Sequence, residues 1–117
     1  MTLPLTHKTL GLVNFEVLRL LKSSAYLINV CRGRVMVEGD LIRALKQGLL
    51  AGAVLDVVEK EPLDPSSELW DLPGVTITPH MSGFSYPHEC AQAFLENLAR
   101  FEKAEPLPDV IDLVKGY

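Results

Sequence analysis

Three short apolar runs, each followed at once by polar residues, organise this chain. The runs lie within residues 25–30, 49–58 and 75–78, and the last has a β-branched side chain at every position. A nearly continuous apolar run of this length is typical of a parallel strand that is covered on both faces. Because β-branched residues also favour strands, the pattern predicts three of them.

Segments with helical spacing of apolar residues precede, separate and follow these runs. Asn14 is a typical helix cap, and the helix that it begins is expected to fade at residues 22–24. A second helix follows residues 38–40 and stops at Gly48, and a third spans residues 88–103. The apolar stripes of the three predicted helices are Phe15, Val17, Leu18 and Leu21; Leu41, Ile42, Ala44 and Leu45; and Ala91, Phe94, Leu95, Leu98 and Phe101.

The alternation of strands and helices predicts an α/β fold with parallel strands. Three strands amount to about half of a doubly wound parallel sheet, and the first would lie at an open edge. The loop of residues 59–73 contains three prolines, and Leu69 and Trp70 are expected to anchor it to the core. Residues 86–117 form the last helix and a tail that needs a surface to bury against, since it is apolar at Val110, Ile111, Leu113 and Val114.

Composition narrows the classes of function. The chain has 117 residues, enough for one domain with a core, and 48% of them are hydrophobic. Its 15 acidic residues outnumber its 11 basic residues and give a formal net charge of −4, which argues against a nucleic acid as partner. No apolar run approaches the roughly 20 residues of a membrane span, and no signal-peptide pattern is visible at the N-terminus. Cys31 and Cys90 show no metal-ligand spacing, so a reducing cytoplasm is the simplest setting.

Chemically active side chains follow the ends of the predicted strands. Arg32 follows the first strand, Asp56 and Glu61 the second, and His80 the third. Ligands of open α/β sheets lie outside the carboxyl ends of the strands, so a cation, two carboxylates and an imidazole are expected to converge there. A guanidinium matches a carboxylate, and an imidazole exchanges protons near neutral pH. Purely structural roles stay open for these residues. Arg32 could be a surface arginine at a strand end, His80 could hydrogen-bond the backbone of its loop, and Asp56 could cap a turn.

Four motifs, in order along the chain, resemble the D-isomer-specific 2-hydroxyacid dehydrogenases. Residues 3–9 resemble the family's Pro-Leu-Thr-x-x-Thr turn, and residues 27–33 its Asn-x-x-Arg-Gly signature. Residues 52–62 resemble its Gly-Ala-x-Leu-Asp-Val-x-x-x-Glu-Pro signature, and residues 78–83 its Pro-His loop. The resemblance implies that residues 1–117 form the C-terminal half of a Rossmann-type NAD(P)-binding domain. It also implies that residues 86–117, a C-terminal helix and tail, would normally pack on a substrate domain that is absent here. Such enzymes interconvert 2-keto acids and D-2-hydroxy acids with NAD or NADP, and this chain does not distinguish the two cofactors.

The resemblance implies roles for three catalytic residues. Arg32 would bind the carboxylate and keto oxygen of a small 2-keto acid. His80 would be the general acid–base, and Glu61 would hydrogen-bond it and favour its protonated form. Glu59, which lies near Glu61 in the sequence, is expected to face solvent instead.

The resemblance also implies a set of residues that contact the cofactor. Asp56 would hold the nicotinamide carboxamide, and Arg32 and His80 would lie beside the nicotinamide. Cys31 is expected to be a packing residue rather than a nucleophile. The backbone that would line the nicotinamide and its ribose belongs to Val30, Cys31, Ser82 and Gly83, and Leu3 and Pro4 would border the adenosine side.

Two features that such enzymes need do not occur in the chain. It contains no Gly-x-Gly-x-x-Gly turn for a pyrophosphate and no counterpart of a substrate domain, so it resembles a fragment that is inactive alone. Two hypotheses follow. The chain is part of an oxidoreductase, or it is a truncated, non-catalytic relative that acts as a protein-binding, corepressor-like module. In either case the open strand edge and the apolar tail favour self-association.

Overall fold

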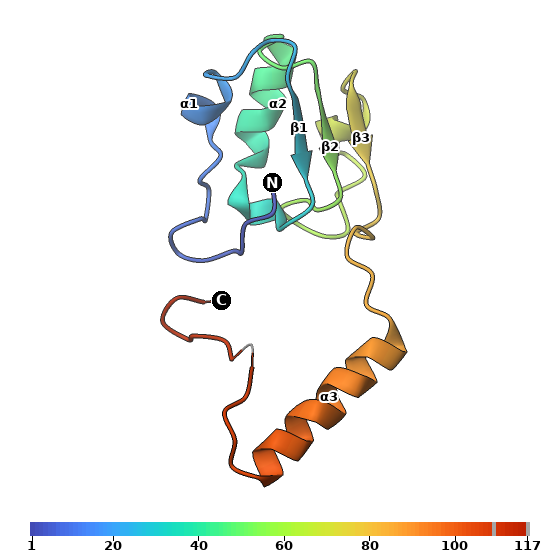
Figure 1. Cartoon of the computed structure of the whole chain (residues 1–117). Coiled ribbons are helices and arrows are strands. Elements are labelled where there is room, and N and C mark those ends of the chain that lie inside the picture. The colour runs from blue at the N-terminus through green and yellow to red at the C-terminus, as the bar shows by residue number, and fades with distance from the viewer. Residues whose placement is uncertain (109, 117) are drawn as a thin grey trace. The chain divides into compact units, whose positions relative to one another are not determined.

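A computed structural model describes residues 1–108 and 110–116 of the chain. The chain divides into two compact units, Met1–Ser82 and Gly83–Tyr117, which are described separately (Figure 1). The first unit holds the sheet and all the predicted catalytic residues. The predicted C-terminal segment of residues 86–117 lies in the second unit, and its residues 109 and 117 lie outside the described residues.

The first unit is built on three parallel strands, as the sequence predicts. The strands are β1 (Tyr26–Asn29), β2 (Gly52–Leu55) and β3 (Val75–Ile77), in the order β1-β2-β3. All neighbouring pairs are parallel. The architecture is that of a partial Rossmann-type sheet, and its strands end at one common edge (Figure 1).

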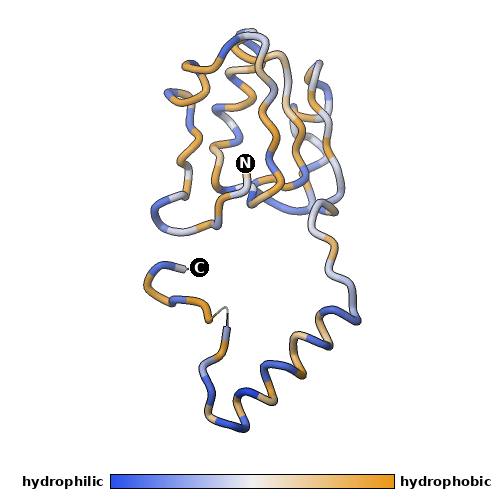
Figure 2. The backbone as a smooth tube through the Cα atoms, in the orientation of Figure 1, coloured by the Kyte–Doolittle hydropathy of each residue, from blue (hydrophilic) through white to orange (hydrophobic). Residues whose placement is uncertain are grey.

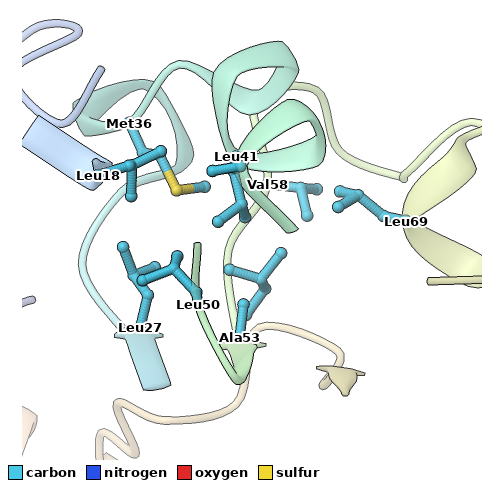
Figure 3. Close-up of a cluster of buried hydrophobic side chains, with 10 residues drawn as sticks. Leu18, Leu27, Met36, Leu41, Leu50, Ala53, Val58 and Leu69 are labelled. Atoms are coloured by element: carbon cyan, nitrogen blue, oxygen red, sulfur yellow. The ribbon is translucent and has the colours of Figure 1, made fainter. Parts of the chain in front are cut away.

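The α2 helix (Glu38–Lys46) connects β1 to β2 and covers one face of the sheet. Leu41 and Ala44 are fully buried against this face, and Gly48 ends the segment with a φ of +68° that favours glycine. Figure 3 shows how side chains of the helix and the strands meet. The buried cluster consists of Leu18, Leu27, Met36, Leu41, Ala44, Leu50, Ala53, Leu55, Val58 and Leu69.

The prediction that β1 is covered on both faces is wrong. Leu27 and Asn29 point into the core and are 6% and 0% exposed, whereas Tyr26 and Ile28 are 61% and 50% exposed. Successive side chains of a strand point to opposite faces, and α2 covers only the face that carries Leu27. The expected edge position of β1 is confirmed, although Met1 partly covers that edge by accepting a hydrogen bond from the Val30 N–H at 3.3 Å.

The first helix is shorter than its apolar spacing predicts. The α1 helix spans only Phe15–Leu18, and the Asn14 side chain caps it by accepting from the Val17 N–H, as expected. The chain then continues through i→i−3 hydrogen bonds, which do not keep the later apolar residues on one face. As a result, Leu18 is buried while Val17 and Leu21 are exposed.

The loop before β3 is anchored by one of the two predicted residues. The short η2 helix (Glu68–Trp70) places Leu69 in the core with 1% exposure. Trp70 is 52% exposed, so its expected role as a core anchor is wrong. Its indole N–H instead donates to the Asp64 carbonyl at 3.0 Å, which holds the ring over the loop.

The second unit contains the predicted long helix, α3 (Pro87–Glu102). Hydrophobic and hydrophilic residues alternate along it with helical spacing (Figure 2). Its apolar stripe is exposed, with Phe94 at 65% and Phe101 at 71%, and the tail residues Leu113 and Val114 are 93% and 85% exposed. Among the described residues, none of the helices is long and apolar enough to cross a membrane.

Candidate active site

Three turns leave the carboxyl ends of the parallel strands and carry the candidate residues. Arg32 follows β1, Asp56 follows β2 directly, and His80 follows β3. Because the strands are parallel and adjacent, their carboxyl ends share one edge of the sheet. This is the edge where ligands bind in open α/β sheets.

The Asn29 side chain holds the Arg32 turn through hydrogen bonds. The Asn29 side chain is fully buried, and its Oδ1 accepts hydrogen bonds from the Cys31 N–H at 3.2 Å and from the Cys31 thiol at 3.0 Å. Its Nδ2 donates to the Arg32 carbonyl at 3.3 Å. The Arg32 guanidinium donates to the Cys31 carbonyl at 2.7 Å and forms no ion pair with any described residue. A cation with no internal counterion can receive an anionic ligand.

A close approach of two backbone segments, rather than a positive φ, requires glycine at position 33. A positive φ is a common reason for glycine in such a turn, but Gly33 has none. A Cβ at this position would lie 1.8 Å from the Val58 carbonyl oxygen and 2.6 Å from the Glu59 nitrogen. The absence of a side chain therefore allows the Arg32 turn to pack directly against the segment that follows β2.

Glu61 and His80 form a hydrogen-bonded pair. The Glu61 Oε2 lies 2.8 Å from the His80 Nδ1, and its Oε1 accepts from the Val58 N–H at 3.4 Å. The hydrogen bond to His80 lowers the pKa of Glu61 from its ordinary value, so the carboxylate stays ionised beside the imidazole. With Nδ1 engaged in this way, Nε2 is the ring nitrogen that can exchange a proton with a ligand. Glu59 is exposed, as predicted.

The Asp56 carboxylate is buried at the end of β2 and faces the His80 turn. Its Oδ1 accepts from the Thr78 hydroxyl at 2.5 Å and from the Met81 N–H at 2.9 Å, and its Oδ2 accepts from the Ser82 N–H at 2.8 Å. Hydrogen bonds from Ser82, Thr78 and Met81 hold the pKa of Asp56 far below its ordinary value. Asp56 is therefore an ionised hydrogen-bond acceptor at neutral pH.

Two residues of the candidate site, Thr78 and Asn29, were assigned no role in the sequence analysis. Thr78 donates to Asp56, and Asn29 holds the Arg32 turn. Both are polar residues at the end of a predicted apolar strand. A buried polar side chain needs internal hydrogen-bond partners, so such a position is the signal that could have identified them.

A cavity of about 330 Å³ lies beside the Glu61–His80 pair. Its walls are mostly apolar and include Trp70, Leu63 and Ile77, with His80 and Glu61 at the polar side. The half-exposed Trp70 is thus part of the site's surroundings rather than of the core.

The other residues predicted to contact the cofactor lie in the turn after β1, in the N-terminal turn and after His80. Cys31 is buried and is a free thiol, consistent with a packing role. Val30 is partly exposed beside it, and the Pro4 carbonyl accepts from the Thr9 hydroxyl at 2.6 Å within an exposed turn that also carries Leu3. The N–H of Ser82 is bound by Asp56, whereas Gly83 begins the second unit.

The residues present fit a nicotinamide. Asp56 presents an ionised carboxylate at the end of β2, and such a group only accepts hydrogen bonds, as an amide N–H donor requires. Three turns at one sheet edge also match the place where open α/β sheets hold dinucleotides.

Comparisons with known proteins find one family and several solved structures that this chain resembles. The family described as D-isomer specific 2-hydroxyacid dehydrogenase, NAD binding domain, matches residues 1–82. A D-isomer specific 2-hydroxyacid dehydrogenase from Xanthobacter autotrophicus Py2, solved in complex with NADPH and MES, is 44% identical with a TM-score of 0.96. A glyoxylate/hydroxypyruvate reductase from Sinorhizobium meliloti, solved with NADP and sulfate, is 40% identical with a TM-score of 0.94. A probable 2-hydroxyacid dehydrogenase from Rhizobium etli CFN 42, solved with NADP, HEPES and L(+)-tartaric acid, is 40% identical with a TM-score of 0.90.

Each of these matches covers 99% of this chain but much less of the relative. The match spans 48% of the Xanthobacter chain and 38% of the Sinorhizobium and Rhizobium chains. This chain therefore corresponds to half or less of the length of these solved structures.

Proposed function

Because the chain belongs to the D-isomer specific 2-hydroxyacid dehydrogenase family, we propose that it is part of an NAD(P)-dependent oxidoreductase acting on small 2-keto and D-2-hydroxy acids. The observation that carries this proposal is the Glu61–His80 pair, with 2.8 Å between Oε2 and Nδ1, at the same sheet edge as the Arg32 turn. It provides a proton donor and acceptor on one turn and a cation on another. The named relatives are dehydrogenases and reductases, so they do not favour a non-catalytic, corepressor-like module.

Each catalytic side chain has a specific task in this proposal. The Arg32 guanidinium binds the substrate carboxylate and orients the keto oxygen, since its planar fork matches a carboxylate and keeps its charge. His80 Nε2 gives a proton to the keto oxygen during reduction and takes it back during oxidation. Glu61 holds Nδ1 and thereby orients the ring. The nicotinamide, when bound, supplies the hydride.

The cofactor contacts follow the same edge. Asp56 accepts the N–H of the nicotinamide carboxamide through its ionised carboxylate. The resemblance assigns the other contacts to backbone and to small or apolar side chains. They are Val30, Cys31, Ser82 and Gly83 at the nicotinamide and its ribose, and Leu3 and Pro4 at the adenosine side.

Activity is tested best in a chimera with a longer relative. The segment of the Xanthobacter autotrophicus enzyme that aligns with this chain is replaced by residues 1–117, and NAD(P)H oxidation is followed with glyoxylate, hydroxypyruvate and bulkier 2-keto acids. We expect turnover with at least one of them and a D-configured product. His80→Ala and Arg32→Ala should each lower kcat/KM by at least about 100-fold, the usual contribution of a general acid or of an electrostatic anchor.

The control for the chimera is His88→Ala, which alters an exposed histidine of the second unit. It should leave kcat/KM within a factor of about two. Near-normal turnover in His80→Ala or Arg32→Ala would contradict the assigned roles. A well-folded chimera with no activity toward any 2-keto acid would contradict the proposed function itself.

The chain alone is expected to bind the cofactor weakly. Pyrophosphates of dinucleotides are bound at a glycine-rich turn and a helix N-terminus, and the sequence contains no Gly-x-Gly-x-x-Gly turn. Isothermal titration calorimetry with NADH and NADPH should show a Kd no tighter than the millimolar range. A micromolar Kd for either cofactor would show that other parts of this chain bind the phosphates.

A further inference from the structure

Asp56 is expected to bind a cofactor, yet its carboxylate is already hydrogen-bonded by residues of the chain itself. Asp56 is 4% exposed, and three hydrogen-bond donors of one short turn, residues 78–82, converge on its carboxylate. His80 is the residue at the centre of that turn. The acceptor and the turn belong to different strand ends, so the contact ties the carboxyl end of β2 to that of β3.

The His80 turn needs such a tie. His80 has a φ of +51°, in the left-handed region that β-carbon sterics disfavour for residues other than glycine. The Met81 and Ser82 N–H groups lie in a turn whose residues are largely exposed, and both point to the same carboxylate. On the other side, the ring of His80 is held by Glu61. The ring and the backbone of His80 are thus held by two different carboxylates.

We propose that Asp56 is a positioning residue, which holds the turn of residues 78–82 in the conformation that presents the His80 imidazole to Glu61. This inference rests on the proposed function, because it gives the acid–base histidine its orientation. It differs from a contact with the cofactor, since all three hydrogen bonds form within the chain itself. Glu61 orients the ring, and Asp56 orients the backbone that carries it.

The charge of the Asp56 carboxylate and the positions of its donors explain why an aspartate suits the end of β2. An ionised carboxylate only accepts hydrogen bonds, which matches one hydroxyl and two N–H donors. In Asp56→Asn one oxygen becomes an NH₂ group, which would face a backbone N–H without an acceptor between them. The side-chain length is unchanged, so this variant tests the hydrogen bonding with little change in packing.

The test uses the full 117-residue chain without ligands and compares the wild type with Asp56→Asn. Amide hydrogen exchange followed by NMR should show the Met81 and Ser82 amides protected in the wild type. In Asp56→Asn these two amides should exchange at least about 10-fold faster, while core amides of β2 keep their rates. Uniform acceleration of all amides would mean that Asp56 only stabilises the fold, and unchanged Met81 and Ser82 rates would overturn the proposal.

The titration of Glu61 separates positioning from simple charge repulsion. Asp56 and His80 are the charged groups that act on Glu61, the first raising and the second lowering its pKa. If Asp56 acted only through its charge, Asp56→Asn would lower the pKa of Glu61. If Asp56 positions His80, the loosened pair should raise the pKa of Glu61 toward its ordinary value, as followed by side-chain carboxyl ¹³C shifts.

Two further variants keep the test decisive. Thr78→Val removes one donor to Asp56 at nearly constant shape, and it should move both measurements in the same directions by smaller amounts, even where Asp56→Asn does not fold. Asp64→Asn removes another carboxylate, which accepts from the Ser66 N–H at 2.8 Å in the loop before η2. It should change neither measurement. Because no cofactor or substrate is present, a negative result here does not bear on the proposed dehydrogenase activity.

Discussion

Gly33 follows the arginine of the candidate site and packs directly against the backbone after β2. A methyl group added at this position would lie 1.8 Å from the Val58 carbonyl oxygen. Since backbone cannot move aside as a flexible side chain can, Gly33→Ala forces the two turns apart. We expect the free energy of unfolding to fall by about 1–3 kcal/mol, measured by urea denaturation.

Gly39 provides the matched control for this substitution. It lies in α2, and a Cβ there would meet no atom within 4 Å. Alanine has the higher helix propensity, so Gly39→Ala should leave stability unchanged or raise it by up to about 1 kcal/mol. Equal losses in both variants would mean that the contact between Gly33 and Val58 does not limit the Arg32 turn.

The residues of the site differ in how far the sequence could identify them. The hydrogen bond between Glu61 and His80, which the family resemblance implied, is confirmed. The reason for Gly33 and the partner of Thr78 were not predictable in this way. Both depend on contacts between residues about 20 positions apart, whose register is set only when the strands pair.

The strand β1 shows how burial differs between the two faces of one element. Leu27 is 6% exposed within the core cluster, whereas its neighbour Ile28 is 50% exposed. Leu27→Ala should therefore lower the free energy of unfolding by about 2–5 kcal/mol, because it removes buried methyl groups and leaves a cavity. The measurement is again urea denaturation of the full chain.

Ile28→Ala is the control within the same strand. Its side chain lies on the face that α2 does not cover, so the loss should be about 1 kcal/mol or less. A loss equal to that of Leu27→Ala would show that the second face of β1 is buried in solution.

The apolar runs predicted the strands and helices well, but they did not predict which faces of these elements are packed. The three parallel strands, the Asn14 cap, α2 and α3 are confirmed, because each depends on local sequence. The coverage of β1 was predicted wrongly, since an apolar run of this kind does not reveal how many faces are packed. The length of α1 was also wrong, because its spacing of apolar residues continues after the hydrogen bonding has changed.

At the scale of the whole molecule, many large apolar side chains are exposed to solvent. They lie in both units, such as Tyr26 and Ile28 of the sheet and Phe94 and Phe101 of α3, and they continue into the tail. Contiguous apolar patches on soluble domains usually mark surfaces that bind other protein.

The chain alone is therefore expected to self-associate. Static light scattering after size-exclusion chromatography should give an apparent mass above the monomer mass of 12.9 kDa that increases with protein concentration. The tail side chains Leu113 and Val114 are 93% and 85% exposed, so replacing both by serine should lower the apparent mass at a given concentration. The charged residues Glu102 and Lys103 at the end of α3 provide the matched control, because replacing both by serine leaves the net charge and the apolar side chains unchanged. A single monomeric species over the whole concentration range would contradict the prediction, and equal effects of the two double variants would remove the tail as its cause.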